Sequence, residues 1–167
     1  CNMLLRDQAL HAKTGIYAAG GMPHECPVAS VSDGLSIAHS GMRFSLVSRE
    51  IIADSVEAST RGHQWDGIFA IGGCDKNLPG LMMGIVRCNV PGVFVHGGAA
   101  LPGHFRGRDT NIGETYEMIG KVLAHEATAD DLHEITHSCL PTAGSCAGQF
   151  TANTMGMVSE ALGLAPI

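Results

Sequence analysis

The sequence predicts an α/β fold, with a three-layer α/β/α arrangement built on a mainly parallel sheet. Two apolar runs, at 67–71 and 90–96, are each followed by a pair of glycines, and segments of helical periodicity lie between and around them. Apolar strands that alternate with helices form βαβ units, whose parallel sheet is covered by helices on both faces. The 22 glycines among 167 residues are typical of the tight turns in such a fold.

The N-terminal third is predicted to hold a helix, a strand and a second helix. Apolar residues recur at helical spacing over 2–18, and Gly20–Gly21 ends that helix. The short apolar run 28–31 ends in a Ser-Asp-Gly turn, which indicates a strand. Ser48 is expected to cap the second helix, over about 49–61.

The rest of the chain continues the alternation. The strand at 67–71 precedes a helix whose first turn can hold Pro79, because a first-turn N–H has no partner to lose. The strand at 90–96 comes next. Further helices are expected at about 111–124, at 129–137, and from the glycine-bearing turn 141–148 to about Leu162. The segment 99–110 is expected to be surface without regular structure.

Composition and charge exclude several classes of protein. The formal net charge is −6 and the longest basic cluster is Arg106–Arg108, so a nucleic-acid surface is not expected. No stretch reaches the roughly 18 apolar residues that span a bilayer, and no signal peptide is visible. We therefore expect no membrane partner and a cytoplasmic location. The chain opens with Cys1 rather than Met, so we expect a piece of a longer protein.

Six cysteines are dispersed along the chain, and a disulfide scaffold is the first interpretation to weigh. It fits poorly, because the chain is long and rich in core residues and lacks a secretory segment. Cys26, Cys88 and Cys139 lack a glycine-rich setting at a strand end and are interpreted as structural. Cys1 and Cys146 each stand at a predicted helix start, where packing and metal binding remain alternatives.

The tripeptide Cys74-Asp75-Lys76 is the strongest candidate for chemistry. A surface turn with paired ions is the ordinary interpretation of such a triplet. A glycine pair before it and a helix start after it favour a ligand-binding loop at the carboxyl end of a strand. Aspartate is a hard ligand suited to Mg²⁺ and cysteine a soft ligand for iron or zinc, so one loop could hold two metals. Asp33, in the Ser-Asp-Gly turn, is expected at the same edge.

Other motifs carry less weight. Most of the nine histidines are interpreted as surface residues, although His39 lies in a glycine-flanked loop. Neither the dinucleotide-binding glycine pattern nor the phosphate-binding loop is present, so nucleotide binding has no support. The turn around Cys146 only faintly matches a nucleophile elbow, which needs serine at the centre and a strand before it. Pattern and spacing alone therefore indicate a set of possible metal ligands, without a reaction.

A combination of segments is more specific than any single motif. In order, the chain carries CNMLLRDQA, VSDGLSIAHSGMRFSLVSREIIADSVE, GGCDKNLPGLMMGIVRCNVPGVFVHGG, LPGHFRGRD and LPTAGSCAGQFTANTMGMVSEALGL. Together they resemble the N-terminal part of the dihydroxy-acid/6-phosphogluconate dehydratase family. The resemblance runs through essentially all of residues 1–167, which we expect to form one incomplete N-terminal metal-binding domain. The forms SGMRFSLVSRE and FTANTM favour the dihydroxy-acid branch.

The resemblance implies two metal groups. An iron–sulfur cluster would be bound by Cys1, Cys74 and Cys146, leaving one iron open as a Lewis acid. Mg²⁺ would be bound by Asp33 and Asp75, and in many relatives by a carbamate on the lysine that corresponds to Lys76. Relatives with a Cys-Pro-Thr-Cys-Gly-Ser-Cys segment have cysteine at the position of Ala143. This departure favours a 2Fe–2S over a 4Fe–4S cluster.

The resemblance also implies the reaction, a hydro-lyase dehydration of a 2,3-dihydroxy acid to a 2-keto acid in branched-chain amino-acid biosynthesis. The base and one further Mg²⁺ ligand would come from a C-terminal domain, so no catalytic base is assigned here and the piece alone is expected to be inactive. A homodimer is expected for the full-length protein. A sugar-acid (aldonate) dehydratase and a non-catalytic module with zinc on the same three cysteines are the alternatives.

Overall fold

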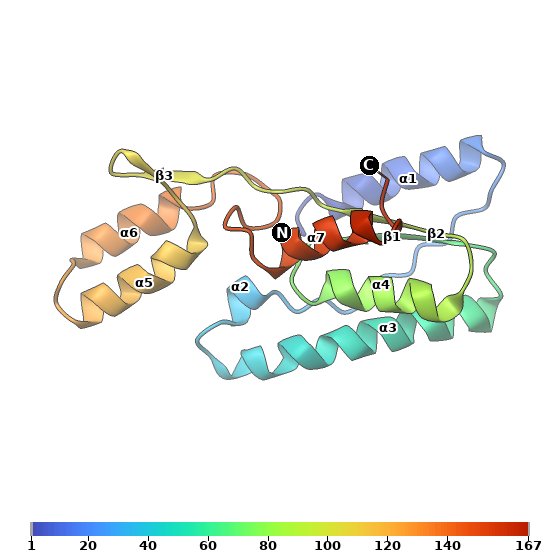
Figure 1. Ribbon diagram of the computed structural model, residues 1–167, viewed down its shortest axis with the longest axis horizontal. Coiled ribbons are helices and arrows are strands. Elements are labelled where there is room, and N and C mark those ends of the chain that lie inside the picture. Colours follow the sequence, from blue (N-terminus) through green and yellow to red (C-terminus); the bar gives the residue numbers. More distant parts are fainter. Residues whose placement is uncertain (1, 167) are drawn as a thin grey trace.

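The computed structural model describes residues 2–166 and has the alternating architecture of an α/β protein (Figure 1). Its helices are α1 (Leu5–Ala18), α2 (Asp33–Ser36), the 3-10 turn η1 (Ser40–Met42), α3 (Arg43–His63), α4 (Asn77–Cys88), α5 (Ile112–Leu123), α6 (Ala129–Ser138) and α7 (Thr151–Ala161). Its strands are β1 (Ile68–Gly72), β2 (Gly92–His96), β3 (Gly103–Phe105) and β4 (Arg108–Thr110).

Strands β1 and β2 form a parallel pair in which Ile68 lies opposite Gly92 and Gly72 opposite His96. Helix α4 makes the crossover between them and lies on one face of the pair, with α3 packed outside it. Helix α1 lies against β1 on the other face (Figure 1). The predicted α/β class is confirmed.

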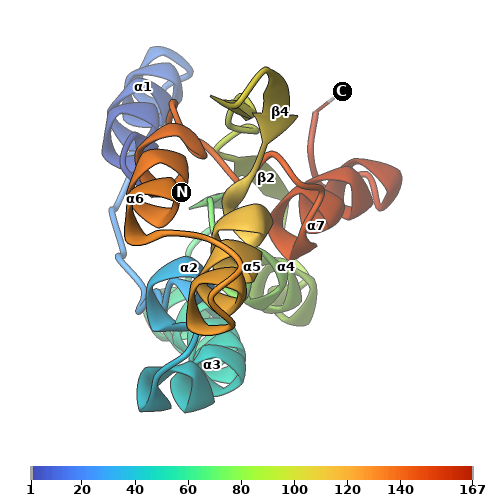
Figure 2. The ribbon, with the colours of Figure 1, turned by 90° about the vertical axis from the view of Figure 1, so that its left-hand side faces the viewer.

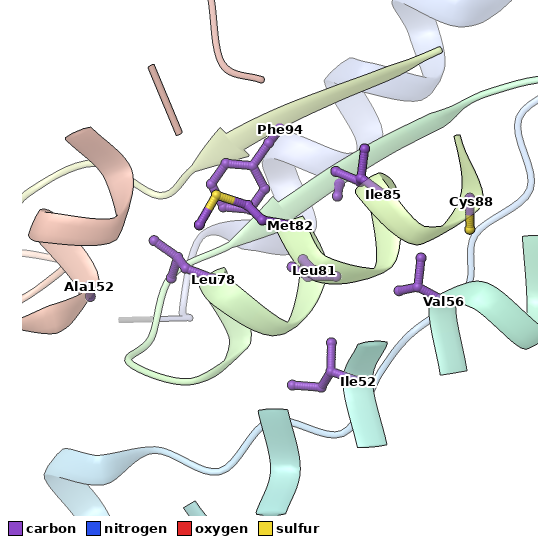
Figure 3. Packing of buried hydrophobic residues seen from close by; sticks show 10 residues of the cluster. Ile52, Val56, Leu78, Leu81, Met82, Ile85, Cys88, Phe94 and Ala152 are labelled. Atoms are coloured by element: carbon purple, nitrogen blue, oxygen red, sulfur yellow. The ribbon is translucent and has the colours of Figure 1, made fainter. Parts of the chain in front are cut away.

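The main core lies between the sheet and helices α3, α4 and α7 (Figure 3). Phe94 of β2 is fully buried and sits over the α4 face that carries Leu78 and Ile85. Helix α3 approaches α4 closely at Gly84, where a Cβ would stand 2.8 Å or less from Val56 side-chain atoms. A small residue is therefore required where the two helices cross.

A further extended segment continues the sheet edge beyond β2. The backbone of Ala99 pairs with Ser145 in a parallel bridge, with hydrogen bonds of 2.7 Å from Ser145 N to Gly98 O and from Ala100 N to Ser145 O. Gly97 N in turn donates to Gly72 O at 2.8 Å. The bridge brings residues 99 and 145 side by side, although a long stretch of chain separates them.

The stretch between them carries a small lobe, which we define as β3, β4, α5 and α6. It lies at one end of the molecule, and the rest is called the large lobe (Figures 1 and 2). Its buried apolar residues are Phe105, Met118, Ile135 and Cys139. Helix α6 begins with a capping box, in which Thr128 and Asp131 each bond the other's backbone N–H.

Three expectations about secondary structure were wrong. Residues 28–31 form no strand, because no described neighbour pairs with their backbone; Val28 instead packs against the main core. The helix expected from residue 49 begins at Arg43, and Ser48 donates to Ser45 O at 2.6 Å inside it rather than capping it. The segment 99–110 contains the antiparallel hairpin β3–β4, which local patterning of such short strands does not reveal.

Within residues 2–166, no helix is both long enough and apolar enough to cross a membrane.

Candidate metal centre

The Cys74-Asp75-Lys76 tripeptide forms the loop between β1 and α4, as the sequence predicts. Cys74 is only 3% exposed, and its backbone N–H donates to the Asn77 side chain at 2.8 Å. The Asn77 amide also donates to Ser30 Oγ at 2.9 Å, so one buried side chain fixes both neighbouring loops. The Cys74 thiol itself lies 3.6 Å from Ser32 Oγ, next to Asp33.

Asp33, Asp75 and Lys76 form a compact charged group beside that cysteine. The Lys76 ammonium contacts the Asp75 carboxylate and lies 3.9 Å from Asp33 Oδ2. Ser45 of α3 donates to the other Asp33 oxygen at 2.7 Å, which orients the carboxylate. All three charged side chains are mostly buried, so a cation is needed between the two carboxylates.

Cys146 reaches the same edge of the sheet from the opposite end of the sequence. The preceding residue, Ser145, is fully buried, and its hydroxyl donates to Gly73 O at 3.2 Å, next to Cys74. Asn153 of α7 donates to Cys146 O at 2.6 Å. The backbone on both sides of Cys146 is therefore tied, on one side to the β1–α4 loop and on the other to α7.

Gly144 allows the segment before Cys146 to lie close to the backbone of residues 99–100. Its φ is +127°, and a Cβ at this position would lie 2.6 Å from Ala100 N. Both the dihedral angle and the close contact exclude an ordinary side chain. The glycine thus allows the Ala99–Ser145 bridge to form one residue before Cys146.

The Cys146 thiol is affected by its electrostatic surroundings. Burial raises the pKa of Cys146, and negative charge on nearby Cys74 and Asp75 raises it further. Two thiolates at this position would repel each other, whereas a shared cation would stabilise both. The donor set, with sulfur on one side and carboxylate oxygen on the other, fits a soft and a hard metal.

The remaining predicted ligands and cysteines fall into separate groups. Cys1 lies outside the described residues, so its place in the cluster stays a prediction. Cys88 is buried in the main core, Cys139 is buried in the small lobe, and Cys26 is exposed with its thiol 3.4 Å from Ser59 Oγ. Both nitrogens of His39 bond to nearby backbone, which gives it a local structural role. Within residues 2–166, no group of three or more His, Cys, Asp or Glu side chains is placed to hold a metal ion.

The sequence gives no hint of Tyr116, which reaches the site from α5. Its hydroxyl donates to Gly34 O at 3.2 Å, adjacent to Asp33. Burial raises the pKa of Tyr116, with further contributions from negative charge on Cys146 and Cys139. This hydrogen bond links the small lobe to α2. Helical periodicity identifies α5 but cannot show which element this residue contacts.

Comparison with known proteins identifies the family. The profile of the dihydroxy-acid/6-phosphogluconate dehydratase N-terminal family matches residues 1–167. The chain belongs to this family. It is 56% identical over 98% of its length to dihydroxy-acid dehydratase 3 of Bradyrhizobium diazoefficiens, and 53% identical over its whole length to dihydroxy-acid dehydratase 2 of Bordetella bronchiseptica. It spans 28% and 29% of those proteins, less than a third of each.

Proposed function

We propose that this chain is the metal-binding part of a dihydroxy-acid dehydratase, a hydro-lyase that converts a 2,3-dihydroxy acid to a 2-keto acid in branched-chain amino-acid biosynthesis. The observation that carries the proposal is the meeting of Cys74, Asp75, Lys76, Asp33 and Cys146 at one sheet edge. Family membership and the names of the relatives support the reaction.

Cys74 and Cys146 are proposed as ligands of an iron–sulfur cluster, of the 2Fe–2S type, together with Cys1. Asp33 and Asp75 are proposed as Mg²⁺ ligands. When bound, the two groups supply a Lewis acid for the departing C3 hydroxyl and a positive charge for the substrate carboxylate and C2 oxygen. The base that removes the C2 proton is proposed to lie outside these 167 residues.

Neighbouring residues of the chain orient these proposed ligands. Asn77 fixes the Cys74 backbone, Ser45 orients Asp33, and Ser145 ties the Cys146 segment to Gly73. Such preorganisation means that metal binding would require little rearrangement of these side chains.

Lys76 is proposed to be carbamylated when Mg²⁺ is bound. As an ammonium it neutralises the two carboxylates, and its conversion to an anion would leave three negative groups together. Carbamate formation and cation binding should therefore occur together. Carbon-13 NMR with labelled bicarbonate should show a carbamate that requires both Mg²⁺ and Lys76, and a signal that persists in Lys76→Arg would contradict this assignment.

Anaerobic reconstitution with iron and sulfide tests the cluster. The protein should turn brown, with visible charge-transfer absorption, and iron content should separate the two cluster types. Cys74→Ser and Cys146→Ser should lose the colour, while the buried control Cys88→Ser should retain it. A colourless protein that takes up a single zinc would favour the non-catalytic module, and equal loss in all three variants would refute this sorting of cysteines.

Measurements of Mg²⁺ affinity test the proposed carboxylate ligands. Asp33→Asn should abolish binding, and Ser45→Ala should weaken it by about tenfold, as expected when a partner that orients a ligand is lost. Asp66→Asn, at an exposed position outside the site, is the matched control. Calorimetry that found Asp33→Asn unaffected would remove Asp33 from the ligand set.

Substrate class separates the two enzymatic hypotheses. The full-length enzyme containing these residues should form a 2-keto acid from a branched 2,3-dihydroxy acid, detectable as its hydrazone. Faster turnover of an aldonic acid would favour a sugar-acid dehydratase of the same family.

A further inference from the structure

Helix α6 carries the segment His133-Glu134-Ile135-Thr136-His137, which places two histidines one helical turn apart. Interpreting the histidines as surface residues overlooks this spacing. Residues at i and i+4 lie on the same helix face, and the His-Glu-x-x-His pattern is one way in which helices bind zinc. The helix belongs to the small lobe, on a different part of the fold from the large-lobe loops of the candidate metal centre (Figure 1).

The two rings are already close and accessible. Their centroids are 4.2 Å apart with planes tilted by 34°, and both residues are exposed. His137 Nδ1 lies 2.9 Å from His133 O. A carbonyl can only accept, so Nδ1 is the donor of this hydrogen bond and Nε2 is left for another partner. Metal-binding histidines commonly donate their other ring N–H to a backbone carbonyl in this way.

We propose that His133 and His137 form a solvent-facing binding site for a divalent transition cation, with water filling the other positions. Two nitrogens on one tetrahedral zinc stand about 3.3 Å apart. Exposed histidines at i and i+4 of a helix can reach this separation by rotation about their side-chain bonds. Among residues 2–166 no third His, Cys, Asp or Glu completes a cage, so the site is an open one. Imidazole nitrogen suits Zn²⁺, Ni²⁺ and Cu²⁺ better than Mg²⁺.

The geometry assigns binding rather than hydrolysis to this motif. In zinc peptidases the glutamate of the motif acts as a general base beside a substrate cleft. Here Glu134 is exposed, and its carboxylate lies 3.9 Å from Arg106 Nε, while Arg106 also pairs with Asp131. The carboxylate therefore faces a guanidinium on the exposed surface, and this is not the setting of a general base beside a substrate.

Equilibrium dialysis with Ni²⁺ at neutral pH tests the site. His133→Gln and His137→Gln should each weaken one binding event by about tenfold or more, since losing a direct ligand costs at least as much as losing its supporting partner. His11→Gln, on the exposed surface of α1, is the matched control and should bind as the parent does. Unchanged binding in both α6 variants, or equal loss in the control, would overturn the proposal.

A second measurement separates this site from the cysteine-containing one. Zn²⁺ should shift the imidazole NMR signals of His133 and His137 in the parent and equally in the Cys74→Ser/Cys146→Ser double variant. Shifts that disappear in the double variant would show that the metal binds at the cysteines, which would refute the histidine site and leave the proposed function intact.

Discussion

The two lobes bury apolar side chains on different scales. Within residues 2–166, the main core of the large lobe gathers ten buried residues from α3, α4, β1, β2 and α7. The small lobe buries four. Its other links are polar ones, including the capping box of α6 and the Arg106–Asp131 ion pair. Burial stabilises at about 25 cal/mol per Å², so the large lobe holds most of the folding free energy.

The difference shows how the candidate metal centre is supported. All of its described candidate ligands come from large-lobe segments, namely the start of α2, the loop after β1 and the loop before α7. The small lobe enters and leaves at the Ala99–Ser145 bridge and touches the site through Tyr116. We therefore expect perturbation of the small lobe to leave the ligand loops largely in place.

Ile52 and Ile135 offer a matched pair, since both are fully buried isoleucines on helices in different lobes. Ile52→Ala should cost about 3 kcal/mol of unfolding free energy, because the cavity lies where α3 packs on α4. Urea denaturation measures the loss. Ile52→Val is the conservative control, with an expected cost of about 1 kcal/mol. A loss in Ile52→Ala no larger than in the control would contradict the assignment of the main core.

Ile135→Ala should cost about 2 kcal/mol, nearer the lower end of the range, because the small cluster can collapse around the cavity. Hydrogen exchange should show lost protection in α5 and α6, with α3 and α4 unchanged. Uniform loss of protection in both lobes would show that they unfold as one unit and would break the comparison.

Thr128→Ala removes the hydroxyl that accepts from Asp131 N, at a distance of 3.2 Å, at the start of α6. We expect a loss of about 1 kcal/mol, confined to that helix. Thr136→Ala is the matched control, because its hydroxyl donates to Leu132 O within the same helix and caps nothing. Equal destabilisation in both would mean that the cap does not set the stability of α6.

The smallest expected effect is on the pH dependence of folding stability. The backbone N–H of Thr128, its hydroxyl and Arg106 together lower the pKa of Asp131 below its ordinary value. Folding favours the ionised form of Asp131. Its contribution to stability is therefore fully present above the pKa of the unfolded state, and it is lost as the pH falls through the lower pKa of the folded state. NMR titration should show this lowered pKa, moved partway back in Thr128→Ala. An ordinary pKa for Asp131 would show that electrostatic interactions do not contribute to the cap.

Local sequence patterns predicted most of the helices and strands. They failed where a strand forms only if a second segment is available to pair with it. Strands β1 and β2 could be recognised because each is a short apolar run that glycines end. Residues 28–31 are also apolar, but no strand among residues 2–166 pairs with them. The hairpin β3–β4 is too short for alternation to show, and Gly103 lies against the backbone at the end of α6, which no local signal encodes.

The sequence by itself determined the family, the α/β class and the candidate ligands Cys74, Asp75 and Cys146. Motif order and hydrophobic period can both be read along the chain without knowledge of its folding. Only the tertiary structure decided which of these groups meet. Gly144 and the buried Ser145 bring Cys146 beside the β1–α4 loop across 72 residues of sequence. The backbone pairing and charge interactions that join them depend on distance in space, and spacing along the chain does not fix that distance.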